Sequence, residues 1–197
     1  MDIIAEYEKR YAPLYKMDIL VEYANKYYDM YKLFNYGVFH HACGCVIAQK
    51  IQFSTGRKIR EALYKLCGFP LTQQNILKYD LTKINGLSEE KIVLLKEMAS
   101  MEEDLEEYRK LRGFGPWSYN AVGIIVNKKE DINLASDKYI RKNIKLYNDI
   151  DNQKNCFCFL ETAKNNKTKV CYFLWRLKPQ SVYKILNNEI LHREDFL

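Results

Sequence analysis

Apolar and polar residues alternate along this chain with the spacing of amphipathic helices. Predicted helices cover about residues 17–33, 39–52, 56–66, 72–77, 81–84, 91–98, 102–110, 117–126, 138–147, 156–163, 168–177 and 180–186. Residues 148–155 are polar and are predicted to form a loop. Residues 170–175 are apolar and partly β-branched, so a strand fits the pattern there as well as a helix. With only four prolines and eight glycines, the chain is predicted to be all-α.

Local stop and start signals divide this pattern into separate helices. Gly68 and Pro70 end the helix before them, because glycine suits a helix C-terminus and proline cannot continue a helix. Asn85 and Gly86 form a second stop signal, and Ser88 is predicted to cap the helix that follows.

The most informative segment has the sequence LRGFGPWS at residues 111–118. Gly113 and Gly115 lie between two predicted helices, which is typical of a tight hairpin whose backbone N–H groups can approach a phosphate. Pro116 suits the first turn of the next helix, where its missing N–H is not needed. Asp137 follows 22 residues after Gly115, at the start of another predicted helix. The chain thus offers an anchor for a nucleic-acid backbone and, one helix later, a carboxylate.

Charge is distributed unevenly along the chain. The net charge is +6, and residues 1–137 hold equal numbers of basic and acidic side chains. Residues 138–197 hold 12 basic and 6 acidic side chains, so the whole excess lies after Asp137. A basic surface there would bind a polyanion with salt-sensitive affinity. A solvated, lysine-rich helical surface explains the same charge distribution equally well.

The six cysteines indicate free thiols rather than a disulfide framework. No signal for secretion is apparent at the N-terminus, and neither Cys-X-Cys pair has the usual spacing of a zinc site. No apolar run is long enough to span a membrane. We therefore expect an intracellular protein, in the cytoplasm and nucleoid or in a nucleus, with no metal site.

Four segments, taken in order, resemble the helix-hairpin-helix (HhH-GPD) DNA glycosylase superfamily, most closely its AlkA-like 3-methyladenine branch. They are VIAQKIQFS at 46–54, NGLSEEK at 85–91, LRGFGPWS at 111–118 and LASDKYIRK at 134–142. The resemblance covers about residues 39–147, roughly half of the chain. It departs from the family at three places. Only Gln49 of the G-Q-Q-x-S motif is kept, Arg112 replaces a proline, and Leu134-Ala135-Ser136 replaces an apolar-proline lead-in to the aspartate.

The resemblance implies a two-lobed helical fold with an active-site cleft between the lobes and a helix-hairpin-helix DNA anchor. The chain, 1–197, would be a single domain with one lobe at about 39–136, including the hairpin at 111–116, and the other at 1–38 plus 137–197. The cysteines lack the spacing of the iron–sulfur loop found in other branches. No cofactor is expected, apart from a structural monovalent cation that the hairpin of this family can hold.

The resemblance assigns the catalytic carboxylate to Asp137. Cleavage of an N-glycosidic bond develops oxocarbenium character on the sugar, which a carboxylate stabilises, and the carboxylate can also orient the attacking water. The positive end of a helix would keep Asp137 ionised. The alternative is that Asp137 or Ser136 only caps the helix.

The residue two positions after the second hairpin glycine is also informative. Branches that cleave the DNA strand carry a lysine there, which forms a Schiff base with the sugar. Trp117 occupies this position. The resemblance therefore implies a monofunctional hydrolase without AP lyase activity, and Lys138 is a poor substitute for the missing lysine.

Further residues are assigned to DNA by the same resemblance. The hairpin would bind the backbone, and a side chain near the end of the helix at 39–52 would fill the space left by an extruded base. Trp117 and Tyr119 are candidates for a base pocket that stacks an electron-poor purine. Gln49 could instead only satisfy a helix end. The expected DNA-binding residues are Arg112, Gly113, Phe114, Gly115, Ser118, Gln49 and Lys50.

The sequence therefore predicts a base-excision repair enzyme that hydrolyses alkylated purines from duplex DNA. The expected partner is double-stranded DNA with damaged bases, the expected state is a monomer, and no membrane association is expected. Two alternatives stay open. One is a DNA-binding protein that has kept the hairpin and lost catalysis, and the other is a glycosylase with another specificity, such as oxidised guanine.

Overall fold

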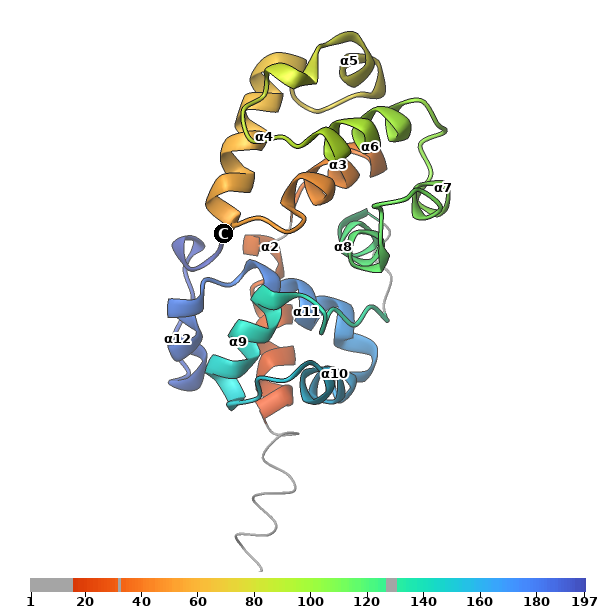
Figure 1. Cartoon of the computed structure of the whole chain (residues 1–197). Coiled ribbons are helices and arrows are strands. Elements are labelled where there is room, and N and C mark those ends of the chain that lie inside the picture. The colour runs from red at the N-terminus through yellow and green to blue at the C-terminus, as the bar shows by residue number, and fades with distance from the viewer. Residues whose placement is uncertain (1–15, 32, 127–130) are drawn as a thin grey trace, which may run out of the picture. The chain divides into compact units, whose positions relative to one another are not determined.

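A computed structural model of the chain describes residues 16–31, 33–126 and 131–197 (Figure 1). Parts of the predicted first helix and of the predicted second lobe, at residues 1–15 and 32, lie outside the described residues. The chain forms two compact units. The central unit spans residues 34–127, and the split unit combines residues 1–33 with residues 128–197.

Each unit is built from helices. The central unit contains α3 (Val38–Ala48), α4 (Phe53–Cys67), α5 (Gln73–Lys78), η1 (Leu81–Lys83), α6 (Glu89–Ala99), α7 (Leu105–Arg109) and α8 (Pro116–Val126). The split unit contains a helix over residues 16–26, then α2 (Tyr28–Tyr31), α9 (Lys138–Asn148), α10 (Gln153–Glu161), η2 (Lys164–Asn166), α11 (Lys167–Arg176), η3 (Pro179–Ser181), α12 (Val182–Leu186) and η4 (Arg193–Asp195). The prediction of an all-α fold is confirmed, since the described residues form only one isolated β-bridge, between Leu177 and Phe196.

Helix α3 is the core of the central unit and packs against α4, α6 and α8 (Figure 1). Its apolar side chains are almost completely buried, and its two ends are half-buried. At the N-terminal end, the carboxylate of Glu103 accepts a hydrogen bond through Oε1 from the N–H of Phe39 at 3.0 Å. At the C-terminal end, the ammonium of Lys91 donates hydrogen bonds to the carbonyls of Ile47 and Gln49 at 2.7 and 2.8 Å. Both charges complement the helix dipole.

Helix α9 organises the split unit by packing against α11 and α12. Its buried Asn143 donates to the carbonyls of Leu174 and Leu177, at 2.7 and 2.8 Å, where α11 ends. The Tyr147 hydroxyl donates to the carbonyl of Lys16 at 2.8 Å, which ties the N-terminal helix to the end of α9. These bonds connect segments that are far apart in the sequence.

The structure corrects three local predictions. Residues 170–175 lie inside α11, so the strand alternative is wrong. The helix predicted at 102–110 is shorter, because Asp104 accepts N–H bonds from Glu106 and Glu107 and so starts α7 at Leu105. Ser88 occupies the N-cap position of α6 as predicted, but its side chain does not make the capping bond.

No disulfide joins any of the six cysteines, all of which lie in the described residues, and Cys158 alone among them is exposed. Within residues 16–31, 33–126 and 131–197, no helix is long and apolar enough to cross a membrane. No group of three or more His, Cys, Asp and Glu side chains in these ranges is arranged to hold a metal ion.

Buried His40 predicts a pH dependence of stability. Its Nδ1 accepts the N–H of Leu71 at 3.1 Å, and burial, with His41 and Arg60 nearby, lowers its pKa to about 4. The unfolded chain therefore binds more protons than the folded chain between pH 6.5 and 4. The contribution of neutral His40 to the free energy of unfolding is fully present above pH 6.5. It should fall by about 2–3 kcal/mol as the pH drops toward 4.

Urea unfolding at pH 7.5 and 4.5 measures this difference. His40→Asn retains an acceptor for the Leu71 N–H and should reduce the difference, with His41, whose pKa burial also lowers, supplying part of what remains. An unchanged pH dependence in this variant would contradict the assignment.

Candidate DNA interface and carboxylate site

The glycine segment forms a tight hairpin between α7 and α8, as the sequence predicts. The N–H of Leu111 donates to the carbonyl of Tyr108, and the N–H of Phe114 donates to the carbonyl of Leu111, both at 3.1 Å. Gly113 has φ +101°, a conformation that glycine adopts readily. Helix α8 then begins at Pro116.

The two hairpin glycines have different physical roles. A Cβ at Gly113 would lie 3.2 Å from Cδ2 of Leu94, so both space and φ favour glycine there. A Cβ at Gly115 would meet no described atom within 4 Å. The open space at Gly115 adjoins the first turn of α8, whose earliest bond back to the hairpin runs from the N–H of Tyr119 to the carbonyl of Gly115. An anion can approach such a helix start closely.

Gln49 fastens the hairpin to the end of α3. Its Nε2 donates to the carbonyl of Gly113 and to the Oγ of Ser118, each at 2.8 Å. Ser118 is buried, so its hydroxyl serves this contact. Both N–H bonds of the Gln49 amide are thereby used inside the protein. The prediction that Gln49 and Ser118 bind DNA stays a prediction, and the structure gives both side chains an internal hydrogen bond. The Gln49 amide binds the hairpin and Ser118 rather than the end of a helix, which was its expected alternative.

Lys91 belongs to a segment that resembles the glycosylase superfamily, but the sequence alone does not predict a role for it. It ends the NGLSEEK segment, and its ammonium binds the last carbonyls of α3, including that of Gln49. Burial lowers the pKa of Lys91. Lys91 and Gln49 together connect α6, α3, the hairpin and α8.

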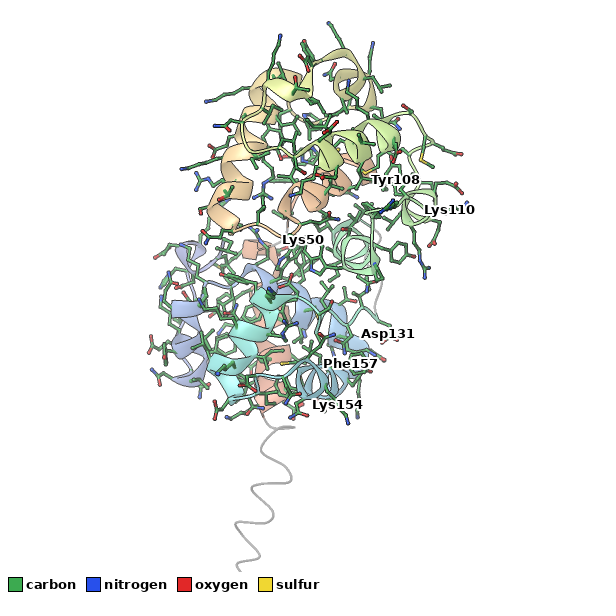
Figure 2. All side chains as sticks on the ribbon, in the orientation of Figure 1. Lys50, Tyr108, Lys110, Asp131, Lys154 and Phe157 are labelled. Carbon is green, nitrogen blue, oxygen red and sulfur yellow. The ribbon has the colours of Figure 1, made fainter. Side chains whose placement is uncertain are left out.

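The other predicted DNA contacts differ in exposure. Arg112 is exposed at the hairpin, whereas Phe114 is buried against Tyr108 with ring centroids 6.0 Å apart, so only the backbone of Phe114 could face a ligand. Lys50 is exposed just after α3 and has φ +57° (Figure 2). A lysine in the left-handed region costs about 1 kcal/mol or more, and such strain gathers at functional sites.

Trp117 and Tyr119 do not lie on one face of α8. Residues two apart on a helix are separated by about 200° around its axis. The hydroxyl of Tyr119 donates to Glu106, and the guanidinium of Arg109 lies 5.0 Å from its ring centroid, so Tyr119 packs toward α7. The structure therefore does not bring the two predicted pocket residues together. Trp117, half-buried in the first turn of α8, stays a candidate.

Asp137 is the N-cap of α9 in the split unit. Its Oδ1 accepts the N–H of Tyr139 at 2.7 Å and the N–H of Ile140 at 3.0 Å, and the residue is buried. The capping role expected as an alternative is therefore present, and it belongs to Asp137 rather than to Ser136. The same bonds fix the carboxylate at the positive end of the helix. Burial raises the pKa of neighbouring Tyr139 to about 12, opposed by Arg176 and reinforced by Asp137.

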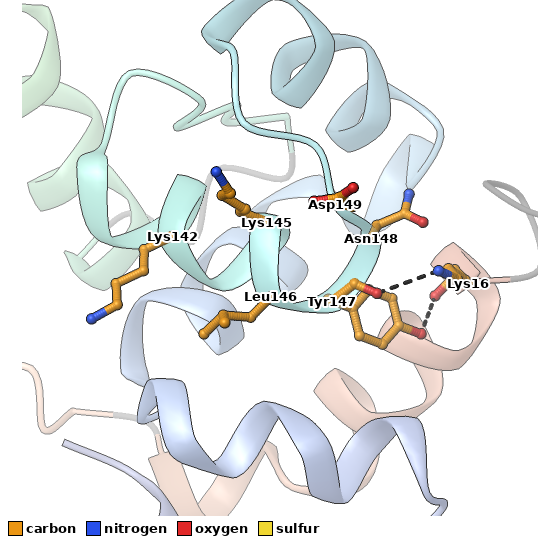
Figure 3. Close-up of a pocket in the computed structure, with 7 residues that line it drawn as sticks. All are labelled: Lys16, Lys142, Lys145, Leu146, Tyr147, Asn148 and Asp149. Atoms are coloured by element: carbon orange, nitrogen blue, oxygen red, sulfur yellow. Dashed lines mark hydrogen bonds between the residues drawn. The ribbon is translucent and has the colours of Figure 1, made fainter.

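Exposed lysines follow Asp137 along one side of α9. Lys138, Lys142 and Lys145 are spaced by four and three residues, which places them on one helix face. Lys142 and Lys145 also border an open cavity of about 550 Å³, together with Lys16 (Figure 3). Lys145 is 3.3 Å from Asp151, an exposed ion pair of small energetic value. This lysine face lies in the part of the chain that carries the excess positive charge.

The monovalent cation allowed at the hairpin stays a prediction. Two hairpin carbonyls, of Leu111 and Gly113, already accept hydrogen bonds from the protein, and each has a second lone pair.

The two glycines provide a matched pair of variants. Gly113→Ala should lower the free energy of unfolding by about 1–3 kcal/mol, because alanine is strained at this φ and crowds Leu94. Gly115→Ala should change it by no more than about 0.5 kcal/mol, yet weaken binding to duplex DNA by filling the open space. Urea unfolding and fluorescence anisotropy measure the two effects. Equal stability losses in both variants would contradict this account.

No protein-family model matches the sequence, and no curated protein matches it either. Solved structures that share its fold include two DNA glycosylases. One is a 3-methyladenine DNA-glycosylase from Archaeoglobus fulgidus, with a TM-score of 0.64 and 23% sequence identity over 73% of this chain and 58% of that chain. The chain thus spans less than two thirds of that protein. The other is a DNA-3-methyladenine glycosidase from Bacillus halodurans, with a TM-score of 0.58 and 14% identity over 81% of this chain and 78% of that chain. This chain therefore has the all-α fold of these two DNA glycosylases.

Proposed function

We propose that this protein is a monofunctional DNA glycosylase that removes alkylated purines from duplex DNA. The observation that carries the proposal is the pairing, in the expected order, of a glycine hairpin open to an anion with a buried carboxylate at the start of α9. The shared fold with two 3-methyladenine glycosylases supports the substrate class.

In this proposal the hairpin anchors the DNA backbone. Phosphate oxygens accept N–H bonds from the hairpin and from the first turn of α8, while Arg112 adds a charge-assisted contact. Lys50, which is exposed and has a left-handed backbone, fills the space that the extruded base leaves. Extrusion costs a few kcal/mol, which these contacts offset.

Asp137 acts on the sugar of the extruded nucleotide. As the N-glycosidic bond breaks, its electron pair leaves with the base and positive charge develops at C1′ and the ring oxygen. The carboxylate stabilises that charge and accepts the proton of the water that attacks C1′. A cationic alkylated purine leaves readily because it departs as a neutral base. Trp117, in place of a Schiff-base lysine, makes water the nucleophile, so the product is an intact strand with an abasic site.

The capping bonds of Asp137 also favour a second candidate, a DNA-binding protein without catalysis. Capping uses only one oxygen of the Asp137 carboxylate and requires no catalytic role for this residue. The two candidates differ in what asparagine does at this position, because asparagine caps a helix as well as aspartate does but carries no charge.

Substitutions at Asp137 separate the two candidates. Asp137→Asn should leave the free energy of unfolding within about 0.5 kcal/mol of the parent. It should also slow base release by about 100-fold or more, because the charge that stabilises the sugar cation is lost. Asp137→Ala should slow release by at least as much, and should lower stability by about 1 kcal/mol through loss of the cap.

The assay uses a panel of duplexes that carry methylated purines, hypoxanthine or 8-oxoguanine, read on denaturing gels with and without alkali. Strand breaks that need alkali report hydrolysis without lyase activity. Release by Asp137→Asn at the parental rate would disprove the mechanism. DNA binding with no release from any lesion would support the non-catalytic candidate, and preferential release of 8-oxoguanine would overturn the proposed specificity.

The lysine face of α9 predicts a salt dependence. If Lys138 and Lys142 each neutralise a phosphate, replacing both with glutamine should reduce the slope of log K against log salt by up to about 1.8. Lys154 is an exposed lysine on α10 (Figure 2), and the control Lys154→Gln, which removes one charge outside the lysine face, should leave the slope unchanged. Identical slopes for the double variant and the control would show that the lysine face is only a solvated surface.

A further inference from the structure

The backbone that leads into Asp137 is fixed by side chains rather than by proline. The N–H of Ile132 donates to Thr168 Oγ1 at 3.0 Å, and the N–H of Leu134 donates to the Sγ of Cys171 at 3.5 Å. The N–H of Ala135 donates to the side chain of Asn133 at 3.0 Å. Irregular backbone needs such partners when it is buried, because helix or sheet bonds are not available to it.

Asn133 is itself anchored to α10. Its Nδ2 donates to the carbonyl of Phe157 at 3.1 Å and to Glu161 Oε1 at 2.7 Å. Glu161 in turn pairs with Lys167 at 2.7 Å, and the hydrogen bonds from Lys167 and Asn133 lower its pKa. Asp131, at the start of the segment, also pairs with Lys167, and the labels of Asp131 and Phe157 locate this region in Figure 2. The beginning of the segment is therefore held against α10 and α11.

Arg141 holds the end of the segment. It lies one turn into α9, and its Nη1 donates to the carbonyls of Ala135 and Ser136 at 2.9 and 2.8 Å. The N–H of Asp137 donates back to the carbonyl of Leu134 at 2.8 Å, which closes a turn over residues 134–137. Arg141 of α9 thus binds the turn that precedes Asp137, the N-cap of the same helix.

These bonds fix one particular peptide plane. The carbonyl of Ser136 and the N–H of Asp137 belong to the same planar peptide unit. Arg141 binds the carbonyl, and Leu134 accepts the N–H, so the plane is held at both of its polar atoms. Rotation of this plane would change φ of Asp137 and redirect its side chain. The capping bonds to Tyr139 and Ile140 then set the carboxylate itself.

We propose that Arg141 is a positioning residue for the carboxylate of Asp137. It does not contact the substrate. It replaces the rigidity of a proline lead-in by fixing the peptide plane between Ser136 and Asp137. The consequence for catalysis rests on the proposed function of Asp137, whereas the consequence for the turn does not. A displacement of about 1 Å in a catalytic group can slow a reaction about 100-fold.

The test compares Arg141→Gln, Arg141→Lys and the control Lys154→Gln in the full chain. Amide hydrogen exchange, measured by NMR, reports the turn directly. Exchange of the Ala135 and Asp137 amides should speed up by about 10-fold or more in Arg141→Gln and not in the control. Single-turnover release of bases from methylated duplex DNA should slow about 10- to 100-fold. The Kd for the same duplex should change by less than about twofold, because the proposed role of Arg141 lies in its bonds to the Ala135 and Ser136 carbonyls and not in a DNA contact.

Arg141→Lys should recover part of the rate, since an ammonium can donate to the carbonyls that Nη1 binds but sits on a shorter side chain without a planar guanidinium. A general loss of stability would instead lower rate, affinity and protection throughout the split unit. Unchanged exchange at residues 135 and 137 in Arg141→Gln would overturn the proposal, and so would faster exchange with a parental rate of base release. If the parent releases no base from any lesion, the proposed function fails, and the exchange data still decide whether Arg141 fixes the turn.

Discussion

The ends of α3 set the constraint on which the candidate DNA interface depends. A buried helix leaves N–H groups at one end and carbonyls at the other, and removing these from water without partners is costly. Glu103 accepts an N–H at the N-terminal end of α3, and Lys91 donates to the carbonyls at its C-terminal end. Gln49, which follows the last turn of α3, then reaches the hairpin and α8. The position of the hairpin is therefore a consequence of how the core helix ends.

The split unit uses the same solution at the candidate catalytic carboxylate. Asn143 binds the last carbonyls of α11, and Asp137 binds the first N–H groups of α9. Structural and chemical roles need not exclude each other at Asp137, because the bonds that cap the helix also orient the carboxylate. Arg141 extends this arrangement to the backbone before the cap.

Much of the framework could be predicted from local signals in the sequence. The helical period gave the order of the helices, and the glycine spacing with Pro116 gave the hairpin. The bonds of Gln49 and Lys91 join residues more than 40 positions apart, so no local pattern reveals them. The separation of Tyr119 from Trp117, in contrast, could be predicted from the sequence, because a helical projection of α8 places the two side chains on opposite faces. The pattern predicts one helix over residues 102–110, whereas Asp104 is an N-cap residue and starts the helix after itself.

In the proposed mechanism, the hairpin and Asp137 bind the same damaged nucleotide. A crystal structure of the Asp137→Asn variant with a duplex that contains a methylated purine is the decisive experiment. We expect hairpin N–H groups on phosphate oxygens and the side chain at position 137 in contact with the deoxyribose of the extruded nucleotide. A complex with the hairpin on the DNA and position 137 away from any sugar would contradict it.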